Sequence, residues 1–127
     1  MTGNVTSRGE AWPEELRAGD CLDEDVSSPR RGDEFETVVP CDEPHSTQIF
    51  LEIDLDSDDY PSREEIAEAG ARCETEFEAW VGVPPEASEL DVSDLYPSED
   101  NWDYETTLKC VVVAPQDVTE SLEGSGR

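Results

Sequence analysis

Residues Ser62 to Gly82 read SREEIAEAGARCETEFEAWVG and carry the clearest secondary-structure signal in the chain. Ser62 followed three residues later by Glu65 forms a capping box, which marks a helix start. Apolar side chains then recur at three- and four-residue steps and share one helical face: Ile66, Ala69, Cys73, Phe77, Trp80 and Val81. Gly82 and Pro84-Pro85 end the pattern, because proline cannot continue a helix. We therefore expect one amphipathic helix with Cys73 in the middle of its apolar stripe.

Several segments around this helix are predicted to form strands. Cys21-Leu22 is a short strand or edge segment, and Glu36 to Cys41 is strand-like, with Pro40 at a sheet margin. Thr106 to Val113 is a continuous apolar run that is typical of a central strand. Val83 to Asn101 reads as a long ordered connection that packs its apolar side chains.

The clearest strand pattern lies in Gln48 to Leu55, where side chains alternate between two faces. Ile49, Leu51, Ile53 and Leu55 fall on one face, and Phe50, Glu52 and Asp54 fall on the other. The sequence therefore predicts an α+β fold: a small antiparallel sheet of about four strands packed against one long helix.

Composition and length limit the partners and the domain organisation. The 127 residues include 34 acidic and 8 basic side chains, for a formal charge of -26. Such a domain is a poor partner for nucleic acid or anionic lipid. We expect a polar N-terminal tail over residues 1–12, one domain over 13–115 and a polar C-terminal tail over 116–127. Residues Met1 to Glu10 lack an apolar core, so we expect no signal peptide, membrane anchor or direct membrane insertion in this sequence.

Four cysteines are spread along the chain without any Cys-x-x-Cys pair, which disfavours zinc and thioredoxin-type sites. An even count favours two disulfides and an oxidising compartment. Spacing leaves all three connectivities open. Because Cys73 faces the sheet and Cys41 ends the strand nearest in sequence, we predict Cys41–Cys73 and, by difference, Cys21–Cys110.

His45 is the only histidine and the first candidate for catalysis. Ser46 adjoins it and Asp42 and Glu43 precede it, but adjacent Ser and His side chains rarely meet in the geometry of a catalytic triad. No nucleophile elbow is present. We expect the ring nitrogens of His45 to bond backbone carbonyls of its turn, and we expect no enzymatic activity and no cofactor.

The alternative candidate site is a calcium-binding loop. Asp54, Asp56 and Asp58 alternate, and Glu65 follows Asp54 by eleven positions, as in loops where a distant Glu completes the coordination shell. Asp59 stands where such a loop needs glycine, Pro61 interrupts it, and Glu65 already belongs to the capping box. The alternative function is thus a calcium-binding acidic module; solvated turn acids are the default reading.

Several short motifs follow one another in a fixed order along the chain. They are LRAGDCL at Leu16 to Leu22, VPCDEPH at Val39 to His45, the helix with Cys73, Phe77 and Val81-Gly82, and Trp102 ahead of Cys110. This set resembles the septum formation domain family of actinobacteria. The ending Ser121-Leu122-Glu123-Gly124 resembles that family as well.

The resemblance implies an extracytoplasmic, cell-envelope domain, usually tethered by an N-terminal membrane segment, with a role in septum formation during division. It implies no enzyme. We expect a non-catalytic domain that binds an envelope or division protein through Asp42, His45 and Trp102. Two departures stand out: the tether is missing from this sequence, and Glu105-Thr106-Thr107 replaces the family's usual Gly-Asp-Arg. If that arginine pairs with a carboxylate, the pair is missing here.

Overall fold

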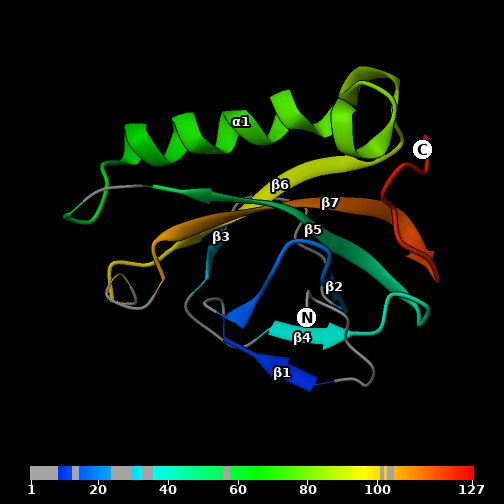
Figure 1. Ribbon diagram of the computed structural model, residues 1–127, viewed down its shortest axis with the longest axis horizontal. Helices are drawn as coiled ribbons and strands as arrows, with labels where there is room; N and C mark the ends of the chain where they lie inside the picture. The colour runs from blue at the N-terminus through cyan, green and yellow to red at the C-terminus, as the bar shows by residue number, and fades with distance from the viewer. Residues whose placement is uncertain are drawn as a thin grey trace.

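A computed structural model describes residues 9–12, 15–23, 30–32, 36–55, 58–100, 102 and 105–127. In chain order, its elements are β1 Gly9–Ala11, β2 Cys21–Leu22, β3 Arg30–Gly32, β4 Glu36–Val39, β5 His45–Asp54, α1 Arg63–Val81, the 3-10 turn η2 Pro85–Ala87, β6 Asp91–Pro97 and β7 Thr107–Val118. Figure 1 shows α1 lying along one face of the sheet that these strands build. The predicted α+β class is confirmed.

The described strands form one seven-stranded sheet in the order β1-β4-β2-β5-β7-β6-β3. All neighbours pair antiparallel except β3, which runs parallel to β6. The expected number of about four strands is therefore wrong. The central position predicted for the last strand is confirmed, since β7 lies between β5 and β6.

The helix α1 agrees closely with its sequence pattern. The Ser62 hydroxyl accepts from the Glu65 amide, the Glu65 carboxylate accepts from the Ser62 amide, and Gly82 ends the helix in the left-handed conformation with φ 109°. Ala69, Cys73, Phe77 and Val81 are buried in the first core, which lies between α1 and the sheet, and Ile66 and Trp80 are partly buried against it. Phe50 of β5 contacts the rings of Phe77 and Trp80 at centroid distances of 6.4 and 5.5 Å.

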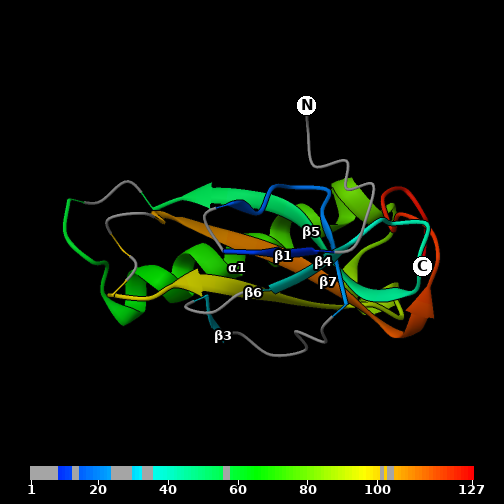
Figure 2. The ribbon, with the colours of Figure 1, turned by 90° about the horizontal axis from the view of Figure 1, so that it is seen from below.

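The sheet encloses a second core on its other face. Leu22, Val38, Ile49, Leu95 and Val111 belong to this cluster, which brings together side chains from β2, β4, β5, β6 and β7. Figures 1 and 2 show that β1 and β4 curl away from α1 to the opposite side of β5 and β7. Because the sheet covers part of itself, β5 and β7 are buried on both faces.

A bulge in β5 corrects the predicted alternation of that strand. Ile49 pairs with Val111 and Leu51 pairs with Cys110, so that Phe50 is the extra residue. An extra residue reverses the faces on its two sides. Ile49 therefore lies in the second core and Phe50 packs under α1, whereas the plain alternation placed them the other way round.

The disulfides join Cys21 to Cys41 and Cys73 to Cys110, with Cα–Cα distances of 5.4 Å in both. The predicted pairing of Cys41 with Cys73 and Cys21 with Cys110 is wrong. β4 lies beside β2, and Cys21 pairs with Val39, two residues before Cys41. β7, not β4, passes beneath the middle of α1, and its Cys110 belongs to the same core as Leu108 and Val112.

The segment 116–127, predicted to be a polar tail, completes the first core. β7 continues to Val118, and Leu122 has no exposed surface. The amides of Gly124 and Gly126 donate to the carbonyl oxygens of Trp80 and Val81 at the end of α1, at 2.7 and 2.9 Å. In the expected N-terminal tail 1–12, β1 pairs with β4, and residues 1–8 lie outside the described part of the chain.

Gln48 links this C-terminal segment to Cys41 of the first disulfide and to the nearby Gly19. Its Nε2 donates to the Gly19 carbonyl and to Ser121 Oγ at 3.2 and 3.0 Å, and its Oε1 accepts from the Leu122 amide at 2.7 Å. A single buried amide thus fixes two segments far apart in sequence. Among the described helices, none is long and apolar enough to cross a membrane.

Candidate functional site

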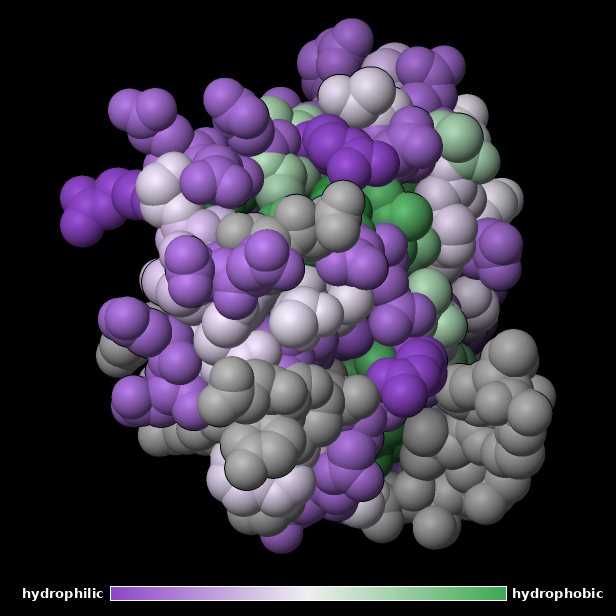
Figure 3. All heavy atoms as spheres, turned by 60° about the vertical axis from the view of Figure 1, so that its left-hand side comes forward, coloured by the Kyte–Doolittle hydropathy of each residue, from purple (hydrophilic) through white to green (hydrophobic). Residues whose placement is uncertain are grey.

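A cavity of about 740 Å³ opens between the N-terminal half of α1 and strand β6. From α1 and the turn before it, its lining includes Tyr60, Arg63, Ile66, Gly70 and Glu74; from β6, it includes Val92, Ser93, Asp94 and Tyr96. Figure 3 turns this end of the molecule forward and shows hydrophobic side chains exposed between hydrophilic ones. Most of the lining is apolar, and volumes of roughly 300 to 1,000 Å³ are typical of small-ligand sites.

Asp94 is the one carboxylate of this cavity that is buried, with 7% of its surface exposed, among the residues described. Strand alternation places it between Val92 and Tyr96 on the face toward α1. Burial raises the pKa of Asp94 to about 6. Its Oδ1 has no hydrogen-bond partner in the part of the chain that the structure covers, and neither has Ser93 Oγ.

Gly70 on α1 leaves room for this carboxylate. A Cβ atom at position 70 would stand 2.9 Å from Asp94 Oδ2, closer than real side chains approach. A side chain at position 70 would therefore displace the Asp94 carboxylate from the space that it occupies beside α1.

Tyr60 forms one wall of the cavity and is held from two sides. Its hydroxyl donates to the Pro97 carbonyl at 2.8 Å, and its ring meets Trp102 edge-on at a centroid distance of 5.7 Å. Trp102 is buried and supports the cavity wall through its contact with the ring of Tyr60.

A second polar cluster lies on the opposite face of the sheet, around Lys109. Its Nζ donates to Glu52 Oε1 at 3.1 Å and to Thr107 Oγ1 at 2.7 Å, and it lies 3.3 Å from Glu105 Oε2. Burial acts to raise the pKa of Glu52, but the hydrogen bonds from the Ala18 amide and from Lys109 outweigh it, so the pKa lies below its ordinary value. Lys109 is thus a buried cation with two carboxylate partners, Glu52 and Glu105.

The predicted interaction surface of Asp42, His45 and Trp102 is not one surface. Asp42 is exposed, but His45 has no exposed surface and so offers none to a partner. His45 begins β5 opposite Val118, whereas Trp102 precedes the end of β7 that pairs with Asp54. The two residues therefore lie toward opposite ends of the β5–β7 pair.

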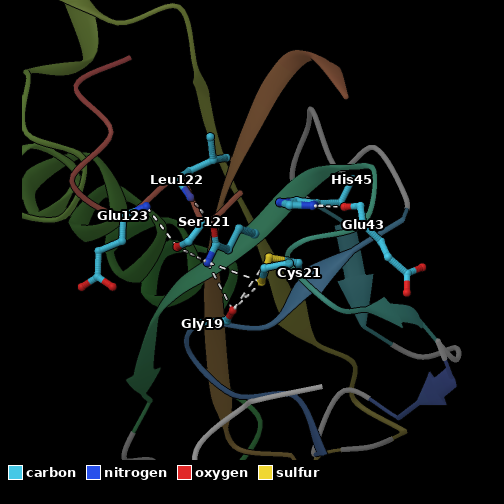
Figure 4. The surroundings of a disulfide bond; sticks show 9 residues. Gly19, Cys21, Glu43, His45, Ser121, Leu122 and Glu123 are labelled. Atoms are coloured by element: carbon cyan, nitrogen blue, oxygen red, sulfur yellow. Dashed lines mark hydrogen bonds between the residues drawn. A yellow bond between two sulfur atoms is a disulfide. The ribbon is translucent and has the colours of Figure 1, made fainter. Parts of the chain in front are cut away.

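The ring of His45 holds its own turn through one nitrogen, whereas both nitrogens were expected to bond backbone carbonyls. Its Nδ1 lies 2.8 Å from the Glu43 carbonyl oxygen, which can only accept, so Nδ1 carries the proton (Figure 4). Nε2 is buried and has no partner within the described residues. The ring does not line the cavity at α1 and β6.

The calcium residues remain dispersed over different elements. Asp54 ends β5, Asp58 lies in the following bend, and Glu65 caps α1; Asp56 lies outside the described residues. Among the residues that can be described, no group of three His, Cys, Asp or Glu side chains could hold a metal ion. Calcium binding stays a prediction.

Sequence reasoning missed Asp94, Gly70 and strand β6, which together build the cavity. A pattern that predicts β6 is present in the sequence, because Leu90, Val92, Asp94 and Tyr96 alternate with the period of a strand. The acids and prolines of this segment concealed that period, and nothing local places Asp94 opposite Gly70.

Comparison with known proteins agrees with the resemblance in the sequence. The family model described as septum formation matches residues 2–110. Neither the curated proteins nor the solved structures give a match to the chain. Because the family model covers most of the sequence, including both disulfides and the cavity, the chain belongs to the septum formation family.

Proposed function

We propose that this protein is a non-catalytic, extracytoplasmic binding domain that recognises a component of the cell envelope or of the division machinery. The observation that carries the proposal is the cavity of about 740 Å³ between α1 and β6, with an unpartnered polar group at its base. A buried polar atom without a partner is costly, and such a cost is commonly retained where a ligand supplies the missing contact.

Both disulfides support the extracytoplasmic part of the proposal, because structural disulfides persist in oxidising compartments. Thiol labelling of the protein in intact cells, with and without reductant, tests it. We expect labelling only after reduction. If all four cysteines react without reductant, the domain resides in a reducing compartment and this part of the proposal fails.

The non-catalytic part is supported by the position of the only histidine. His45 is sequestered in its turn, away from the cavity, and the Ser46–His45–acid set therefore has no access to a bound molecule. In the cavity, Asp94 offers a carboxylate for recognition but stands without a histidine.

Photocrosslinking in cells tests recognition through the cavity. Ala71 and Ala79 are both exposed alanines of α1, but only Ala71 lines the cavity. A photoreactive amino acid at position 71 should crosslink to an envelope or division component, whereas the same group at position 79 should not. Equal crosslinking at both positions, or none at position 71, contradicts the proposal.

A further inference from the structure

We propose that the cavity between α1 and β6 binds a small organic cation, whose primary ammonium group pairs with Asp94 while an apolar body contacts the cavity walls. This inference rests on the proposed function, since it assigns the ligand chemistry of the same cavity.

The charge requirement follows from the surroundings of Asp94. Its side chain is more than nine-tenths buried, and Oδ1 lacks a donor among the described residues. Arg63 lines the same cavity but does not offset the burial, which alone accounts for the raised pKa of Asp94. An ammonium group would supply both a donor and the missing countercharge, and charge-assisted hydrogen bonds are stronger than neutral ones.

The cavity reaches the carboxylate at one particular place. At Gly70, the helix presents no side chain, and Asp94 Oδ2 occupies the space that a Cβ atom would need. Gly70 and Asp94 both line the cavity. The buried carboxylate thus belongs to the lining of the cavity at the point where α1 lies close to β6.

The walls specify the remainder of the ligand. Ile66, Ala67, Ala71 and Val92 are apolar, and the rings of Tyr60 and Tyr96 add aromatic surface. Aromatic rings favour both apolar groups and organic cations. The volume of about 740 Å³ exceeds what one lysine side chain fills and falls in the range of small-molecule sites. We therefore favour a free small amine over a lysine of a protein partner, and the net charge of -26 would attract it.

Calorimetric titration of the full, oxidised chain with 2-phenylethylamine tests the proposal, with neutral 2-phenylethanol as the matched ligand. We expect the amine to bind at least about tenfold more tightly than the alcohol, because the alcohol lacks the charge. Asp94→Asn should weaken amine binding by about tenfold or more and should remove the preference over the alcohol. Asp91→Asn, an exposed acid on the same strand, removes the same charge and should change the Kd by less than about twofold.

Gly70→Ala provides a second variant that keeps the carboxylate. The added methyl group should push the Asp94 side chain aside and weaken amine binding by about tenfold or more, while alanine favours the helix. The melting temperature of this variant should be at or above that of the parent. A folded Gly70→Ala protein with unchanged amine affinity contradicts the proposed placement of the ligand.

The pH dependence gives an independent signature. Since the pKa of Asp94 is about 6 and a primary ammonium stays charged, amine binding should weaken by about tenfold between pH 7 and pH 5. Tyr60, Arg63, Glu74 and Tyr96 are the other titratable side chains that line the cavity. We expect the profile of Asp94→Asn to be flat between pH 5 and pH 7. A tenfold loss that persists in this variant would belong to those other groups and would contradict the pairing with Asp94.

Several outcomes overturn the inference: no amine binding at millimolar concentration, equal binding of amine and alcohol, or equal losses in the two aspartate variants. A short lysine-containing peptide that binds the parent chain more tightly than the free amine, and loses affinity in Asp94→Asn, would assign the site to a protein partner instead. If the amine fails while crosslinking at position 71 persists, only the ligand class is wrong and the proposed function stands.

Discussion

Lys109 is a buried cation that holds two carboxylates together on the face of the sheet away from α1. Glu52 lies directly across the strand pair, and Glu105 is itself buried. Lys109→Ala would leave both carboxylates without their cation, and removing one partner of a buried ion pair costs roughly 3 to 5 kcal/mol. We expect a loss of this size in urea unfolding followed by tryptophan fluorescence. Arg72→Ala removes the same charge from an exposed position and should cost less than about 0.5 kcal/mol; equal losses would contradict the role of Lys109.

For Asp94 we expect substitution to raise stability, in contrast to Lys109, because burial in the folded protein destabilises the charged form of the carboxylate. Its pKa rises from 3.8 in the unfolded chain to about 6 in the folded protein, so the folded state binds more protons between these values. The contribution of Asp94 to stability therefore falls as pH rises from 4 to 6, by up to about 3 kcal/mol. Asp94→Asn lacks this loss and should be more stable than the parent at pH 7.5, with the difference disappearing near pH 4. Thermal unfolding at both pH values checks this, and Asp91→Asn should behave like the parent. A stability gain in the variant would mark Asp94 as a residue kept for binding rather than for folding.

At the scale of elements, the C-terminal segment acts as a cover for the end of α1. Leu122 is fully buried in the first core, and the amides of Gly124 and Gly126 occupy carbonyl groups that the helix end would otherwise leave unpaired. Leu122→Ala should therefore lower the free energy of unfolding by roughly 2 to 5 kcal/mol, the range for buried leucines. Glu123→Ala, next to it but exposed, should change it by less than about 0.5 kcal/mol. Equal and small effects in urea titrations would show that the segment does not contribute to the core.

At the scale of the whole molecule, the two disulfides crosslink different parts of the fold. Cys21–Cys41 closes β2 against the end of β4, and Cys73–Cys110 fastens α1 to the sheet. With sequence separations of 20 and 37 residues, the chain-entropy model gives about 3 and about 4 kcal/mol. Replacing either pair by alanines should lower the free energy of unfolding by these amounts in denaturant titrations. Losses below about 1 kcal/mol in both double variants would mean that the cores alone hold the fold, despite the repulsion of so many carboxylates.

Local patterns predicted the parts of the fold that depend on neighbours in sequence. The limits of α1, its capping box, its buried stripe and its glycine end follow from contacts within a few residues. The alternation of β5 could be read only as far as Phe50, because the bulge there is fixed by pairing with β7 and not by the strand's own side chains.

The amino-acid sequence by itself determined one capped helix, its inward-facing Cys73, a central apolar strand and the septum formation family. Only the tertiary structure decided which cysteines pair and that Lys109 forms ion pairs with Glu52 and Glu105. It also decided that Asp94 packs against Gly70 in the lining of a cavity. Helix limits and apolar stripes arise from interactions between residues close in sequence. Disulfide partners and the cavity depend instead on the order of strands in the sheet, which joins residues tens of positions apart and leaves no local trace.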